Sequence, residues 1–132
     1  GDGSTAMGCH TTTSGTYSTA MGDWTRVSAY ASTAMGRYNV NPSSNTQGWT
    51  STDPLFELGN GTDLTHTSDA LIVYKNGNAT LQGTLTAAAL STTGTISAAG
   101  LTTTGTITVT GTGGFMTTST SVANMDIPMF GQ

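Results

Sequence analysis

Ser4-Thr-Ala-Met-Gly8 is the first copy of an exact repeat, because the same five residues recur at 18–22 and 32–36. Each copy begins 14 residues after the one before it, without an insertion. A fixed period of this kind is typical of a solenoid, in which each repeat forms one rung and identical side chains lie above one another. The repeat therefore predicts an all-β stack of parallel rungs over residues 1–45.

Each 14-residue unit divides into two halves, which predicts two short strands and two tight turns per rung. Alternation along the first strand places Thr5 and Met7 on one face and Ala6 on the other. Stacking then produces two apolar ladders, one of Met7, Met21 and Met35 and one of Ala6, Ala20 and Ala34. A thin roll can bury only its inside, so we expect the outer ladder to pack on a neighbour. A small Ala at a turn is the alternative explanation of the second ladder.

A third ladder follows the glycines and consists of His10, Trp24 and Tyr38. Exposed aromatic side chains offer flat apolar faces with a polar edge, so these three residues are a candidate surface-binding site for a glycan or a protein receptor. Cross-strand stacking that only stabilises the rungs is the alternative, and we favour it because such pairs are commonly structural.

Residues 46–78 leave the repeat and are interpreted as a cap and a hairpin neck. Large apolar side chains at Trp49, Leu55, Phe56 and Leu58 are expected to close the inner column. Asn76-Gly77 between two apolar runs predicts a hairpin with strands at about 70–75 and 78–82 and positive φ at both turn residues.

Four carboxylates lie in the segment interpreted as cap and neck, and carboxylate oxygens are ligands for calcium. Their spacing fits no calcium-loop template, so we expect no metal there. They are Asp53, Glu57, Asp63 and Asp69.

A second repeat, with a period of 11 residues, occupies residues 79–111. Gly83, Gly94 and Gly105 are in register, and so are the apolar residues Leu85, Ile96 and Ile107. Each unit has too few large apolar residues to form a core within one chain. Three chains around one axis would bury these three apolar residues as a trimer core, so we predict an intertwined trimeric β-shaft. Residues 112–132 are interpreted as a terminal plug or the start of the next module.

The 14-residue units resemble the head repeats of trimeric autotransporter adhesins of the YadA type, and similar repeats occur in phage and viral fibre proteins. In that family, segments like 52–62 and 69–78 of this chain close the head and lead into a neck or shaft. The resemblance implies a left-handed parallel β-roll head, a homotrimer and attachment at a cell or virion surface. With the two sections that follow the rungs, it implies an elongated homotrimer with an adhesive or structural function outside the cell.

The bulk composition argues against other partners. Only 8% of the residues are charged, and Lys and Arg together number three. Nucleic-acid binding needs clustered basic side chains, so we expect no nucleic-acid partner. No apolar run is long enough to span a bilayer, so we expect no membrane insertion. Residues 76–125 carry no formal charge, and we expect other chains to cover their strand edges. Gly1 falls in mid-repeat, so we expect a segment of a longer array.

No sequence motif supports catalysis or a cofactor. His10 and His66 lack a nucleophile motif, and no phosphate-binding loop or metal-ligand spacing occurs. Cys9 stands at a variable position of the repeat and is interpreted as an incidental exposed thiol. We therefore expect neither enzyme activity nor a cofactor.

Ice binding is the alternative function. Thr84 and Thr86 flank Leu85, and hydroxyl residues flank the apolar residue in the next two repeats in the same way. Alternation would place these hydroxyls in a regular outward ladder, similar to those of Thr-rich ice-binding β-solenoids. Thr suits the wet face of any strand, so the fibre interpretation is favoured.

Overall fold

The computed structural model of the chain describes residues 1–42, 44–100 and 102–104. The chain divides into two compact units, Gly1–Ala89 and Leu90–Gln132. Within the described residues all regular structure is β, and no helix occurs. The strands are β1 (Thr5–Cys9), β2 (Thr12–Thr13), β3 (Thr19–Asp23), β4 (Arg26–Val27), β5 (Thr33–Arg37), β6 (Pro54–Asn60), β7 (Asp69–Tyr74) and β8 (Ala79–Leu81).

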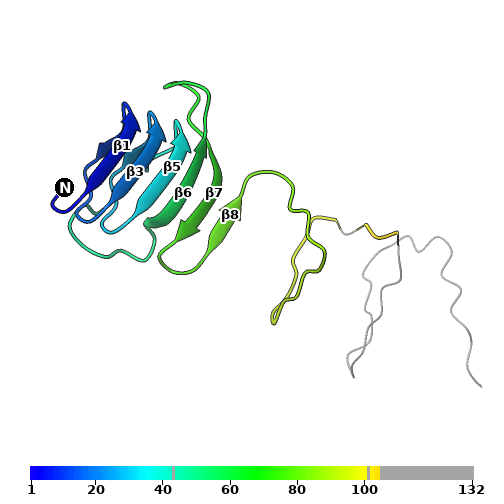
Figure 1. Cartoon of the computed structure of the whole chain (residues 1–132). Coiled ribbons are helices and arrows are strands. Elements are labelled where there is room, and N and C mark those ends of the chain that lie inside the picture. The colour runs from blue at the N-terminus through cyan, green and yellow to red at the C-terminus, as the bar shows by residue number, and fades with distance from the viewer. Residues whose placement is uncertain (43, 101, 105–132) are drawn as a thin grey trace, which may run out of the picture. The chain divides into compact units, whose positions relative to one another are not determined.

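The first unit is built on a sheet of six strands in the order β1-β3-β5-β6-β7-β8, which lie side by side in Figure 1. Strands β1, β3, β5 and β6 pair in parallel, whereas β7 and β8 continue the sheet antiparallel. A second, parallel pair is formed by β2 and β4. The first two rungs therefore contribute one strand to each sheet, as the two halves of the repeat predict.

The register follows the sequence repeat. Ala20 pairs with Ala6 and Ala34, and Met21 pairs with Met7 and Met35. Both predicted ladders are therefore present. Ala20 and Ala34 are fully buried, and with Val27 they form the inner core. The alternative of an Ala at a turn is wrong, since Ala6, Ala20 and Ala34 lie within strands.

The glycine of each repeat is required by the close spacing of the rungs. A Cβ at Gly22 would lie 2.0 Å from the carbonyl oxygen of Gly36, and the φ of Gly22 is +125°. The same contact recurs between Gly8 and Gly22. Neither a side chain nor its usual backbone conformation fits at these positions.

Strand β6 forms a fourth rung that the repeat does not predict. Met35 pairs with Leu58, and Ala34 pairs with Glu57. Glu57 therefore takes the inner position and is 3% exposed. The expectation that large apolar side chains close the column here is not met, because Trp49, Leu55 and Leu58 are 58%, 37% and 39% exposed and Phe56 is only half-buried. Alternation along β6 turns Leu58 outward once Glu57 is inward.

The predicted hairpin joins β7 to β8, but its loop has three residues and not two. The N–H of Gly77 donates to the carbonyl of Tyr74 at 2.9 Å, and the N–H of Tyr74 donates to the carbonyl of Asn78 at 2.8 Å. Gly77 has a φ of +87°, whereas Asn76 does not have a positive φ. The expectation of two positive φ values is therefore wrong. A turn followed by a glycine bulge meets the same need with one such residue.

The residues of the 11-residue repeat that the structure describes form no strand beyond β8. Leu85 is 64% exposed, and in the second unit Leu90 and Ile96 are 68% and 61% exposed. Ile107 and the segment 112–132 lie outside the described residues. Within one chain, the described large apolar residues of these repeats are exposed and do not pack into a core.

Candidate functional site

The aromatic ladder lies at the turns that follow β1, β3 and β5. His10, Trp24 and Tyr38 have φ values of 54°, 54° and 42°, in the left-handed region that costs a residue other than Gly about 1 kcal/mol. Backbone hydrogen bonds hold these turns in line, since Trp24 N–H donates to the Cys9 carbonyl at 2.8 Å and Tyr38 N–H donates to the Asp23 carbonyl at 3.2 Å.

The three rings stack on one another. The centroids of His10 and Trp24 are 4.1 Å apart with an interplanar angle of 8°, and those of Trp24 and Tyr38 are 5.8 Å apart at 14°. Both faces of the Trp24 indole are therefore covered, and the guanidinium of Arg37 lies 4.9 Å from the centroid of Tyr38. Aromatic pairs of this kind contribute about 0.5–1.5 kcal/mol beyond area burial. The geometry favours a stabilising function. Because the ring faces are used in stacking, a partner would contact the edges of the stack.

The outer face of the six-stranded sheet carries an apolar ladder of four rungs. Met7, Met21, Met35 and Leu58 are in register along it. Met7 is 54% exposed and Leu58 is 39% exposed, whereas Met21 and Met35 are half-buried. These side chains point away from the inner column, because their neighbours along the strands, an alanine in the first three rungs and Glu57 in the fourth, take the inner position.

The fourth rung contains a buried carboxylate that sequence reasoning did not identify as one. Glu57 Oε2 accepts a hydrogen bond of 2.6 Å from Asn39 Nδ2, while Oε1 is buried without a partner. Burial, and next the negative charge of Asp69, raise the pKa of Glu57 to about 7, against the hydrogen bond from Asn39. Burial also raises the pKa of Asp69, whose carboxylate accepts from the N–H of Val40.

Lys75 connects three segments of the first unit. Its ammonium group is fully buried, 3.8 Å from Asp53 Oδ2, and lies over the rings of Trp49 at 5.1 Å and Tyr30 at 5.9 Å. Burial lowers the pKa of Lys75, and the charge of Asp53 opposes that shift. Lysine side chains are rarely buried, so nothing in the sequence around Lys75 indicates this contact.

The four carboxylates of residues 53–69 do not converge on one point. Asp53 faces Lys75, and Asp63 is held by Thr65 and His66, whose hydrogen bonds lower the pKa of its carboxyl. Glu57 and Asp69 interact with each other electrostatically, but their contacts are with Asn39 and Val40 of the rungs.

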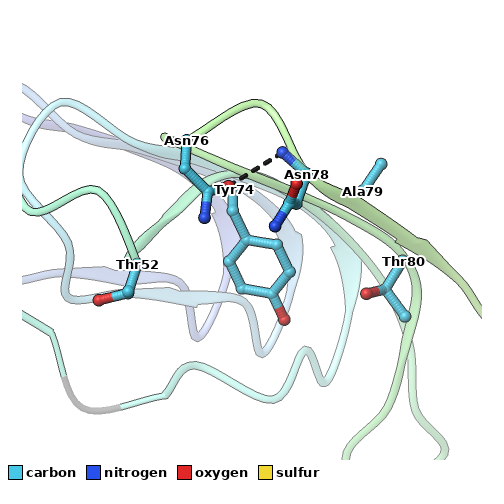
Figure 2. Close-up of a pocket in the computed structure, with 6 residues that line it drawn as sticks. All are labelled: Thr52, Tyr74, Asn76, Asn78, Ala79 and Thr80. Carbon is cyan, nitrogen blue, oxygen red and sulfur yellow. Dashed lines mark hydrogen bonds between the residues drawn. The ribbon is translucent and has the colours of Figure 1, made fainter. Parts of the chain in front are cut away.

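A shallow hollow of about 450 Å³ lies beside the hairpin (Figure 2). Figure 2 shows the ring of Tyr74 among hydroxyl and amide side chains of the hairpin and of Thr52. The hollow is open and lined by no charged side chain, so its lining does not define a ligand. The lining residues are Thr52, Tyr74, Asn76, Asn78, Ala79 and Thr80.

The first two hydroxyl pairs of the ice-binding hypothesis lie outside the strands, and the third pair, Thr106 and Thr108, lies outside the described residues. Thr84, Thr86, Thr95 and Ser97 are exposed, and no strand is assigned to residues 83–100. The hypothesis stays a prediction, which a measurement of thermal hysteresis in dilute solution would test.

The rungs also match a known protein family. The model of the YadA head domain repeat matches residues 1–23 and 14–39. Residues 1–39 carry two copies of the YadA head domain repeat. The match confirms the predicted resemblance over strands β1 to β5. YadA head repeats form a structural adhesin family and not an enzyme family.

The other comparisons add no relative. No curated protein and no solved structure matches the chain. In the part of the chain that the structure describes, no helix is long and apolar enough to cross a membrane.

Proposed function

We propose that this chain is a structural and adhesive segment of a homotrimeric fibre, displayed at the surface of a cell or a virion. The YadA head repeat over residues 1–39 supports this function, because YadA-type adhesins are homotrimeric and surface-exposed. In this proposal the rungs form a left-handed roll, residues 46–78 the cap and neck, and residues 79–111 a trimeric shaft.

The observation that carries the proposal is the outward apolar ladder of Met7, Met21, Met35 and Leu58. Four rungs place the same kind of side chain on the same face, although each inner position is filled by Ala or Glu57. Full burial of a Met or Leu side chain contributes about 1.5–3 kcal/mol. Three copies facing one axis would bury the parts of twelve such side chains that are exposed in the single chain, which favours assembly.

The exposed apolar residues of the 11-residue repeat support the same arrangement. Leu85 and Ile96 are each more than 60% exposed in the single chain. In a trimer they would form a central column, and the backbone groups of residues 83–100 would pair between chains. Ile107 belongs to the same predicted trimer core.

The solution mass tests this function. Sedimentation equilibrium on protein that has never been exposed to denaturant should give three times the chain mass of 13.4 kDa. A monomer that persists at tens of micromolar protein would overturn the proposal. The adhesive part is tested separately by binding of the trimer to an array of surface glycans and to extracellular-matrix proteins.

A further inference from the structure

We propose that Cys9, His10 and Asp23 form a binding site for a divalent metal ion of the zinc class at the end of the first two rungs. One ligand atom from each of these residues lies within 4.8 Å of the other two. Within the described residues, no other group of three such side chains comes as close. Each chain holds a complete site, so the proposal does not depend on the trimer.

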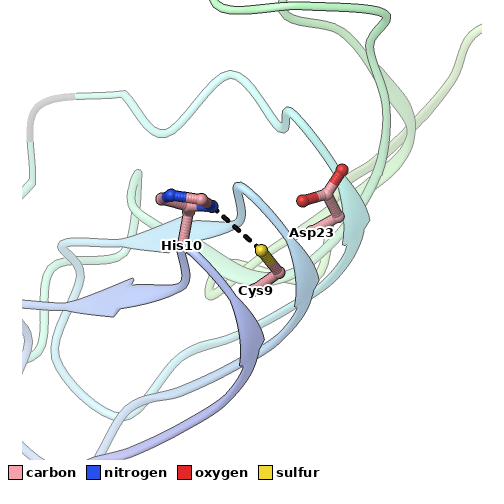
Figure 3. Close-up of side chains that lie close together, drawn as sticks. All are labelled: Cys9, His10 and Asp23. Carbon is pink, nitrogen blue, oxygen red and sulfur yellow. Dashed lines mark hydrogen bonds between the residues drawn. The ribbon is translucent and has the colours of Figure 1, made fainter.

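The backbone brings the three side chains together. Cys9 and Asp23 are register partners at the ends of β1 and β3, so their side chains leave the same face of the sheet. His10 follows Cys9 in a left-handed turn, and its Nδ1 lies 2.9 Å from Cys9 Sγ. Figure 3 shows the sulfur between the imidazole and the carboxylate.

The orientation of the imidazole is fixed before any ion arrives. Its ring lies parallel to the Trp24 indole at 4.1 Å, which restricts rotation about the side-chain bonds. Ligand side chains held by neighbouring groups bind metal ions more tightly than free ones, because less conformational entropy is lost. In the aromatic ladder, this part of the stack therefore positions a ligand as well as stabilising the turn.

The repeat itself sets this position apart. The pair Cys9-His10 is replaced by Asp23-Trp24 in the second unit and by Arg37-Tyr38 in the third. Sulfur, imidazole and carboxylate ligands therefore meet only between the first two of these units. Arg37 Nε binds Asp23 Oδ2 at 3.2 Å, which leaves Oδ1 for an ion. Both partners of that ion pair are about half exposed, so water screens the repulsion of a cation by Arg37.

The ligand set selects the metal. Thiolate and imidazole are poor ligands for calcium and magnesium but suit zinc, cobalt and nickel. Three protein ligands leave a fourth tetrahedral position, which water would occupy because the site is exposed. Tetrahedral ligands at about 2.0–2.3 Å from zinc require Sγ and Nδ1 to separate slightly, which exposed side chains permit. The thiol proton is released to the buffer on binding, so affinity rises with pH.

Cobalt titration of the full chain, kept reduced with a phosphine, tests the site. We expect a thiolate-to-cobalt charge-transfer band that saturates at one ion per chain and is lost on adding zinc. The decisive variant is His10→Phe, which keeps an aromatic ring on Trp24 but removes the nitrogen ligand. It should weaken cobalt binding at least about tenfold, and Asp23→Asn should weaken it less.

The control is His66→Gln, since His66 also contacts a carboxylate, that of Asp63, but has no thiol beside it. It should bind cobalt as the wild type does. Equal affinities of the wild type and His10→Phe would show binding by the thiol alone and would overturn the proposal. Absence of the charge-transfer band at millimolar cobalt would also overturn it. Thermal melts of each metal-free variant establish that the rungs are intact.

Discussion

Glu57 lies beside Ala34 in the parallel register of β5 and β6, so a carboxylate occupies the inner position that alanine fills in the other rungs. It is 3% exposed, and one of its oxygens has no hydrogen-bond partner. The fourth rung therefore resembles the first three in backbone but not in chemistry, and its stability depends on pH.

The buried carboxyl of Glu57 predicts that the first unit is more stable in acid than in mild base. The pKa rises from 4.5 to about 7 on folding, so the folded state holds the proton more tightly. The stabilisation is complete below pH 4.5 and is lost as pH rises through about 7. The shift corresponds to about 3 kcal/mol. Urea denaturation at pH 5 and pH 8 measures it, and Glu57→Gln should remove most of the difference. An unchanged difference in that variant would contradict the assignment.

The contacts of Asn39 predict that its contribution to stability is coupled to the charge of Glu57. It is 2% exposed, accepts from Arg26 N–H and donates to the Arg26 carbonyl, both at 2.8 Å. Asn39→Ala leaves these groups and Glu57 unpaired and should cost about 2–4 kcal/mol of unfolding free energy. Asn39→Asp keeps the acceptor but adds a negative charge beside Glu57, so it should be more harmful at pH 8 than at pH 5. Equal losses for Asn39→Asp at the two pH values would argue against the contact with Glu57.

The close approach of Gly22 to the carbonyl oxygen of Gly36 predicts that no side chain is tolerated at position 22. The Cβ of Gly22→Ala would clash with the carbonyl of Gly36, so we expect a loss of more than about 3 kcal/mol. Gly77→Ala is the matched control, because Gly77 also has positive φ but no atom within 4 Å of its Cβ position. It should cost only about 1 kcal/mol. Similar denaturation midpoints for both variants would contradict the steric argument.

Lys75 is expected to stabilise the first unit through its charge. Lys75→Met keeps the length of the side chain but leaves the carboxylate of Asp53, 7% exposed, without its cation. We expect a loss of about 1–3 kcal/mol in thermal or urea denaturation. The double variant with Asp53→Asn should recover part of the loss, because no unpaired charge then remains. If the loss of stability in the double variant equals the sum of the losses in the two single variants, the ion pair does not account for the effect of Lys75→Met.

A substitution of Met21 tests whether the outward ladder forms the proposed trimer interface. An aspartate on the outward ladder would bring three charges together in the proposed interface, so Met21→Asp should reduce the mass measured by sedimentation toward that of one chain. Leu64→Asp is the control, since Leu64 is 55% exposed in the loop between β6 and β7. It should leave the mass unchanged. A fully assembled Met21→Asp variant would place the interface elsewhere.

The sequence by itself determined the rungs. An exact 14-residue period leaves one in-register arrangement of Ala6, Ala20 and Ala34, because a slip by one residue would move every side chain to the opposite face. The same argument predicted the ladder of His10, Trp24 and Tyr38, and Asn76-Gly77 located the hairpin. These features depend on local spacing and turn chemistry, which a sequence displays directly.

Tertiary structure alone decided the fourth rung and the clusters beside it. Residues 38–53 separate β5 from β6, so no period shows that Glu57 enters the column or that Lys75 reaches Asp53. Burial of a charged side chain depends on partners distant in sequence, which stabilise it only once the chain has folded. The repeat determined the scaffold and the side chains that are neighbours along each ladder, and contacts with residues outside the repeat determined which charged groups are buried.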